Sequence, residues 1–153
     1  MKIAIVSDIH ANLAALQAVL VDIDAVASDA VIWHTGDIVG YNAEPNEVVA
    51  LLRERGAAGV MGNHDAAVLG ELDVRWFNPA AAAAVRWTST HLTFESASWL
   101  HALPKISEMA RPLKMGSSRM NTAPVMAARP VSAMGCARTA ALLITASLKA
   151  MPC

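Results

Sequence analysis

Three short apolar segments alternate with two segments of helical periodicity near the start of the chain. The apolar segments, typical of buried strands, are residues 30–34, residues 58–61 and residues 2–7, the last of which is rich in β-branched residues. Between them, residues 12–27 repeat leucine and isoleucine at helical spacing, and residues 45–56 open with proline and close with glycine. This strand–helix–strand–helix–strand order predicts an α/β fold with a parallel sheet. We expect two alanine-rich helices to follow, at 79–91 and 95–102.

A polar cluster follows each predicted strand at once. These clusters are "SDIHAN" (7–12), "TGDIVGYN" (35–42) and "GNHD" (62–65). In an open parallel sheet, ligands bind outside the carboxyl ends of the strands, and neighbouring strand ends lie close together. Glycines in two of the clusters allow sharp turns. The clusters are therefore expected to converge on one site.

The residue types in these clusters favour metal binding. Asp8 and His10 stand two positions apart, so an extended segment would point both side chains the same way. Asp37 adds a carboxylate, Asn63 an amide oxygen and His64 an imidazole. Such mixed ligands suit Mn²⁺, Fe, Zn²⁺ or Mg²⁺, and a carboxylate can bridge two ions about 3.5–4 Å apart. We expect His64 to meet a phosphate or a leaving oxygen, and Asp65 to orient its ring.

The blocks "DIH", "GDIVG" and "GNHD" resemble the first three signature blocks of the calcineurin-like metallophosphoesterases. The order of "SDIHANLAAL", "GDIVGYNAEPNEVV" and "VMGNHDAA" is similar to the small bacterial and archaeal phosphodiesterase branch, over about residues 1–104. The resemblance implies a four-layer α/β sandwich and hydrolysis of a phosphoester by a hydroxide that two metals activate. It also implies two divalent ions, with Mn favoured over Fe, Zn, Ni or Mg, and a small phosphoester substrate.

The resemblance also implies a role for each matched residue. Asp8 and His10 bind the first metal, Asp37 bridges the two metals, Asn63 binds the second, and His64 contacts the phosphate. His64 and Asp65 together are the expected catalytic residues.

The sequence departs from the family after residue 104. The family carries a further lone metal-binding histidine and a Gly-His-x-His block, but no histidine follows His101 here. We therefore expect the sandwich to be truncated to its first half and phosphoesterase activity to be impaired. The alternatives are a non-catalytic domain that binds a metal or phosphate, and an inactive fragment.

Composition divides the chain after residue 108. The resemblance identifies residues 1–108 as the start of a metallophosphoesterase domain, and residues 109–153 are a divergent basic tail. The first part holds all 13 acidic residues and half of the 12 basic ones. The tail is interpreted either as a natural extension with a helix at 138–151, or as a frame-shifted or disordered segment. Because its pattern does not alternate, we expect it to leave an edge of the half-sheet exposed, which favours self-association.

Other features exclude several classes of function. The formal net charge of −1 gives no reason to expect a nucleic-acid partner. No apolar run reaches about 18 residues, so no membrane span is expected. The apolar run at the N-terminus ends at the charged residue Asp8, so no signal peptide is expected. Cys136 and Cys153 form no metal-spaced pair, which favours a reduced, cytoplasmic protein.

Some polar and aromatic residues have simpler explanations than a functional one. We interpret His34 as a strand residue, and His91 and His101 as surface histidines. The tryptophans at 76, 87 and 99 are expected to pack against the fold. Asn63, His64 and Asp65 could also do no more than cap a following helix.

Overall fold

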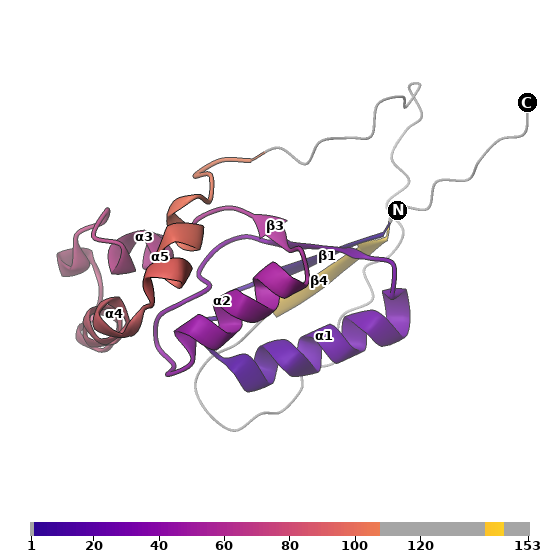
Figure 1. Ribbon diagram of the computed structural model, residues 1–153, viewed down its shortest axis with the longest axis horizontal. Helices are drawn as coiled ribbons and strands as arrows, with labels where there is room; N and C mark the ends of the chain where they lie inside the picture. Colours follow the sequence, from indigo (N-terminus) through magenta and orange to yellow (C-terminus); the bar gives the residue numbers. More distant parts are fainter. Residues whose placement is uncertain (1, 108–139, 146–153) are drawn as a thin grey trace, which may run out of the picture.

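The computed structural model describes residues 2–107 and 140–145 (Figure 1). The strands are β1 (Lys2–Ser7), β2 (Val31–His34), β3 (Ala58–Gly59) and β4 (Ala140–Thr145). They form one sheet in the order β3-β2-β1-β4, in which β1, β2 and β3 run parallel. The predicted parallel α/β arrangement is confirmed.

The helices pack beside the sheet and against one another (Figure 1). They are α1 (Leu13–Ala27), α2 (Pro45–Glu54), α3 (Asn63–Val68), the 3₁₀-helix η1 (Val74–Trp76), α4 (Pro79–His91) and α5 (Phe94–His101). In Figure 1, α1 and α2 lie side by side along the sheet; α3 and α4 pack against each other, and α5 packs against α2. The expected N-cap of α1 is confirmed, because the Asn12 side chain accepts a hydrogen bond from the Ala15 N–H at 3.0 Å.

The core lies between the sheet and its helices. Alternate positions of the strands are buried, such as Ala4 and Val6 in β1 and Ile32 in β2. They pack against a helical stripe that includes Leu16 and Leu20. This packing fixes the strand register, and the register fixes where each following loop begins.

The third strand is shorter than the sequence suggests. β3 covers 58–59 instead of 58–61. The Val60 N–H still donates to the His34 carbonyl at 3.3 Å, but the Met61 N–H donates to the Pro104 carbonyl at 2.9 Å. The chain therefore leaves β2 after Val60, because the segment that follows α5 supplies the next acceptor.

The expected helix at 138–151 is wrong for residues 140–145, which form β4. This strand pairs antiparallel with β1, with Lys2 opposite Thr145 and Ser7 opposite Ala140. Pairing uses backbone N–H and C=O groups, so the edge of β1 accepts an apolar segment that lacks an alternating pattern. The expectation that the tail leaves this edge uncovered is therefore also wrong. The rest of 109–153, and its interpretation as frame-shifted or disordered, lies outside the described residues.

Across residues 2–107 and 140–145, helices fall short of the length and hydropathy needed to cross a bilayer.

Candidate metal centre

Two loops at the carboxyl ends of β1 and β2 bring Asp8, His10 and Asp37 together. Each offers one ligand atom, and these three atoms lie within 4.8 Å of one another. All three residues have positive φ, at 55°, 50° and 53°. Such values are uncommon outside glycine, and here backbone hydrogen bonds hold the loops in register. The His10 N–H donates to the Asp37 carbonyl at 2.9 Å, and the Ala11 N–H donates to the Ile38 carbonyl at 2.7 Å.

The orientation of His10 fits a metal ligand. Its Nδ1 lies 3.3 Å from the Val39 carbonyl and donates to it in the tautomer that leaves Nε2 unprotonated. Nε2 lies 3.8 Å from an Asp8 carboxylate oxygen. A metal-binding histidine typically donates its other ring N–H to a carbonyl or carboxylate, which fixes the tautomer. Two carboxylates and one imidazole in this arrangement fit a divalent cation.

The expected second-metal ligands also lie together. Asn63 begins α3, and its amide nitrogen is 3.2 and 3.1 Å from the two Asp37 carboxylate oxygens in the orientation that donates to them. Rotating the amide would present its oxygen beside the same carboxylate. The His64 backbone N–H donates to Asp37 Oδ1 at 2.9 Å. Among the described residues, Asp37 and Asn63 are the two side chains expected at this second position, and Asp37 is shared with the first.

His64 lies buried beside the trio. Its ring meets that of His10 at 4.6 Å between centroids, and that of Phe77 at 4.8 Å, both edge to face. Burial, and then the nearby His10, lower the pKa of His64. Its buried Nδ1 finds no hydrogen-bond partner within the described part of the chain. Gly40 leaves room for this atom, since a Cβ on Gly40 would lie 2.8 Å from it.

The Asp65 carboxylate does not orient the His64 ring as the sequence suggested. It is fully buried and accepts three backbone hydrogen bonds, from Ile38 at 2.9 Å, Val39 at 3.1 Å and Gly62 at 2.9 Å. Burial raises the pKa of Asp65 to about 6, although these N–H groups favour the charged form. The hydrogen bonds of Asp65 therefore connect the loop after β2 to the start of α3.

The same two segments meet through glycines. A Cβ on Gly36 would lie under 3.0 Å from the backbone of Gly62, and a Cβ on Gly62 would lie under 3.0 Å from Asp37. No side chain fits between these backbones. The glycines therefore allow Asp37 and Asn63 to approach each other.

The remaining histidines lie elsewhere. His34 is a buried residue of β2, and His91 and His101 are exposed, as predicted. The expected packing role of Trp76 is wrong, because that side chain is 83% exposed. Tyr41 was not predicted as a site residue, but its ring centroid lies 4.9 Å from those of both His10 and His64. The only sequence feature that could have pointed to Tyr41 is its position directly after Gly40 in the cluster 35–42.

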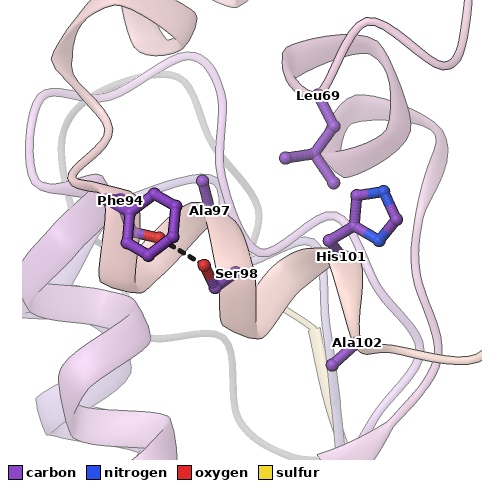
Figure 2. Close-up of a pocket in the computed structure, with 6 residues that line it drawn as sticks. All are labelled: Leu69, Phe94, Ala97, Ser98, His101 and Ala102. Carbon is purple, nitrogen blue, oxygen red and sulfur yellow. Dashed lines mark hydrogen bonds between the residues drawn. The ribbon is translucent and has the colours of Figure 1, made fainter.

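A shallow apolar depression of about 460 Å³ lies away from this centre, on α5 and the end of α3 (Figure 2). Its lining residues are Leu69, Phe94, Ala97, Ser98, His101 and Ala102. Its polar side chains are Ser98, whose hydroxyl donates to the Phe94 carbonyl at 2.7 Å, and His101, whose Nε2 lies 3.6 Å from a Glu71 carboxylate oxygen. The predicted metal and phosphate residues do not line it.

Comparisons with known proteins agree with this geometry. A family model described as calcineurin-like phosphoesterase matches residues 1–128. An uncharacterized protein of Methanocaldococcus jannaschii is 46% identical over 106 residues, which cover 69% of this chain and 43% of that protein.

Solved structures give the same result. The crystal structure of a metallophosphoesterase from Sphaerobacter thermophilus is 46% identical, with a TM-score of 0.55, and the match covers 68% of this chain and 41% of that one. A candidate diadenosine tetraphosphatase is 27% identical, also with a TM-score of 0.55, over 67% of this chain and 43% of that one. The chain spans less than half the length of these relatives.

Proposed function

The chain belongs to the calcineurin-like phosphoesterase family, and on that premise we propose that its site serves metal-dependent hydrolysis of a small phosphoester. Asp8, His10 and Asp37 would hold the first divalent cation. Asp37 and Asn63 would contribute to a second, and His64 would contact the phosphate. Mn²⁺ is the cation we favour.

One observation carries this proposal: three possible ligand atoms from two loops converge within 4.8 Å, and His10 Nδ1 lies 3.3 Å from the Val39 carbonyl, which leaves Nε2 available as a ligand. Isolated acidic groups on a surface would not need a buried imidazole whose tautomer is fixed by a carbonyl. When bound, divalent cations supply Lewis-acid activation of the phosphoester and of the attacking water.

The protein's own contribution at the phosphate comes from His64. Because its pKa is lowered, its imidazole is neutral at pH 7 and can accept or donate a hydrogen bond. Its Nδ1 is free of partners in the described part of the chain. Asp37 holds the His64 backbone, and Phe77 packs against the ring, so the imidazole stays beside the cation ligands.

The shortage of second-site ligands favours a weaker form of this function. Two protein ligands, one of them shared, hold a divalent ion poorly against water, and no histidine follows His101. We therefore expect one tightly bound cation, at Asp8, His10 and Asp37, and turnover near background. The alternatives are a non-catalytic domain that binds a metal or a phosphate, and an inactive fragment.

Titration of the full chain with Mn²⁺, followed by calorimetry, tests the proposal together with turnover of bis(4-nitrophenyl) phosphate. One tight site is expected, with turnover close to that of a His64→Ala control. That control should keep its bound Mn²⁺, since His64 is assigned to phosphate. Turnover well above the control would show that this chain is not impaired, and absence of any Mn²⁺ binding would overturn the assigned site.

A further inference from the structure

Tyr41 has a backbone conformation that is unusual for a bulky residue. Its φ is 62°, a region that suits glycine or asparagine far better than tyrosine. Asn42, the next residue, links this turn to the candidate metal centre. Its backbone N–H and its side-chain amide both donate to the His10 carbonyl, at 3.2 and 2.8 Å. The backbone turn that carries Tyr41 is therefore held against the loop that carries His10.

This ring borders both imidazoles of the centre. Its centroid lies 4.9 Å from that of His10, with the planes at 90°, and 4.9 Å from that of His64, with the planes at 37°. His10 and His64 are only 8% and 6% exposed, but Tyr41 is 44% exposed. Tyr41 therefore adds an open aromatic surface next to a cation ligand and the expected phosphate contact.

A packing role alone does not account for this arrangement. A residue that only filled space would be buried, and a less strained residue would serve a turn better. No hydrogen bond to the Tyr41 hydroxyl occurs within the described ranges, so the phenol does not brace the loop there. Strained residues that the surrounding structure holds in place concentrate at functional sites.

We propose that Tyr41 contacts the substrate and stacks on an aromatic group, such as an aryl ring or a nucleobase, carried by the phosphoester. The inference rests on the proposed function, because the phosphate must lie near His10 and His64 for its substituent to reach Tyr41. An aromatic face accepts any flat π system, so this contact would select a class of substituent and not one compound.

Binding of two simple phosphoesters to the full chain with Mn²⁺ tests the inference by calorimetry. Phenyl phosphate and methyl phosphate share the phosphate but differ in the aromatic group. We expect the unmodified protein to bind phenyl phosphate about tenfold more tightly. Tyr41→Phe should keep that preference, whereas Tyr41→Asn, which suits the positive φ, should lose it. Both variants should bind Mn²⁺ and methyl phosphate as the unmodified protein does.

The outcomes separate the two proposals. Two results would overturn the stacking role and leave the proposed function standing. One is that Tyr41→Asn keeps the preference for phenyl phosphate. The other is that the unmodified protein binds Mn²⁺ and methyl phosphate but shows no preference for phenyl phosphate. If Tyr41→Asn weakens both phosphoesters equally, Tyr41 only positions the imidazoles and the inference is also overturned. Failure of the unmodified protein to bind Mn²⁺ and methyl phosphate would overturn the proposed function, and with it the role of Tyr41.

Discussion

The loops that follow β1 and β2 differ in construction from helices α4 and α5. In the loops, five residues other than glycine have positive φ, and the Ile38 and Val39 N–H groups of the second loop donate to the buried Asp65 carboxylate in α3. In the helices, residues 79–101 contain no positive φ. Side chains cap their N-terminal ends instead. Asn78 accepts a hydrogen bond from the Ala81 N–H at 2.9 Å, and Thr93 accepts one from the Ser96 N–H at 3.2 Å.

This difference between the loops and the helices indicates where metal binding and folding stability depend on the same residues. A strained loop keeps its shape only because its neighbours determine it, so a change there should alter metal binding and folding together. A capped helix is stabilised locally, so a change there should alter folding alone.

The largest effect is expected where the two loop backbones touch. Gly62 has an ordinary φ of −87°, so alanine there adds no backbone strain, only a Cβ that would collide with Asp37. We expect Gly62→Ala to lower the free energy of unfolding by about 4 kcal/mol or more, and to abolish Mn²⁺ binding. Urea denaturation and Mn²⁺ titration measure the two effects.

Gly70 provides the matched control. Its φ is 78°, but a Cβ there would meet nothing within 4 Å. Gly70→Ala should therefore cost only about 1–2 kcal/mol, from left-handed strain, and leave Mn²⁺ binding unchanged. Equal losses in the two variants would show that close approach of the loops is not what matters.

The next effect separates the two candidate cation positions. Asp37→Ala removes a ligand of both, and we expect the affinity for the tight Mn²⁺ to fall about a thousandfold. Asn63→Ala touches the second position alone and should change that affinity by less than about tenfold. Calorimetric titration gives both values, with urea denaturation to confirm that each variant folds. Similar losses in both would mean that Asp37 does not bridge.

The third effect is a pH dependence, because His34 lies buried just before the second loop. Burial lowers its pKa to about 4, and no charged side chain contributes to the shift. The native state therefore disfavours the charged form of His34. The contribution of neutral His34 to the free energy of unfolding should be fully present above pH 6.5 and should fall as the pH drops towards 4. The loss reaches about 3 kcal/mol, and His34→Leu should remove it.

Denaturation of the unmodified protein and the variant at several pH values measures this difference. Asp65 has a raised pKa and acts in the opposite direction, but it is common to both proteins and cancels. A profile for His34→Leu that runs parallel to that of the unmodified protein would contradict the assignment to His34.

The smallest effect belongs to the helices. Asn78→Ala removes the side-chain cap of α4 and should cost about 1 kcal/mol in the free energy of unfolding. Asn78→Ser, which keeps a capping oxygen, should cost less. Neither variant should alter Mn²⁺ affinity, and a change in that affinity would show that the helices and the metal centre are coupled.

Much of this arrangement could be predicted from the sequence because it depends on local patterns. Apolar periodicity gave the order of β1 to β3 with their helices, and polar residues at the strand ends gave the convergence of Asp8, His10 and Asp37. Their metal binding stays a prediction.

The rest depends on contacts between distant segments. The early end of β3 follows from the acceptor at Pro104, and the role of Asp65 follows from N–H groups more than twenty residues away. Alanine-rich residues 140–145 favour a helix locally, but they become a strand because β1 offers an unpaired edge. The positive φ of Tyr41 likewise occurs in a turn that Asn42 joins to the His10 carbonyl, 32 residues earlier in the chain.

The pairing of β4 with β1 has a consequence for the order of folding. β1 is made first during synthesis, but its partner residues 140–145 lie almost at the other end of the chain. Closing so long a loop costs about 4 kcal/mol of chain entropy before any pair forms, whereas β1 and β2 are joined by α1 alone. Contacts of such high contact order form slowly. We therefore expect the parallel strands and their loops to assemble early, and β4 to join them as the last step.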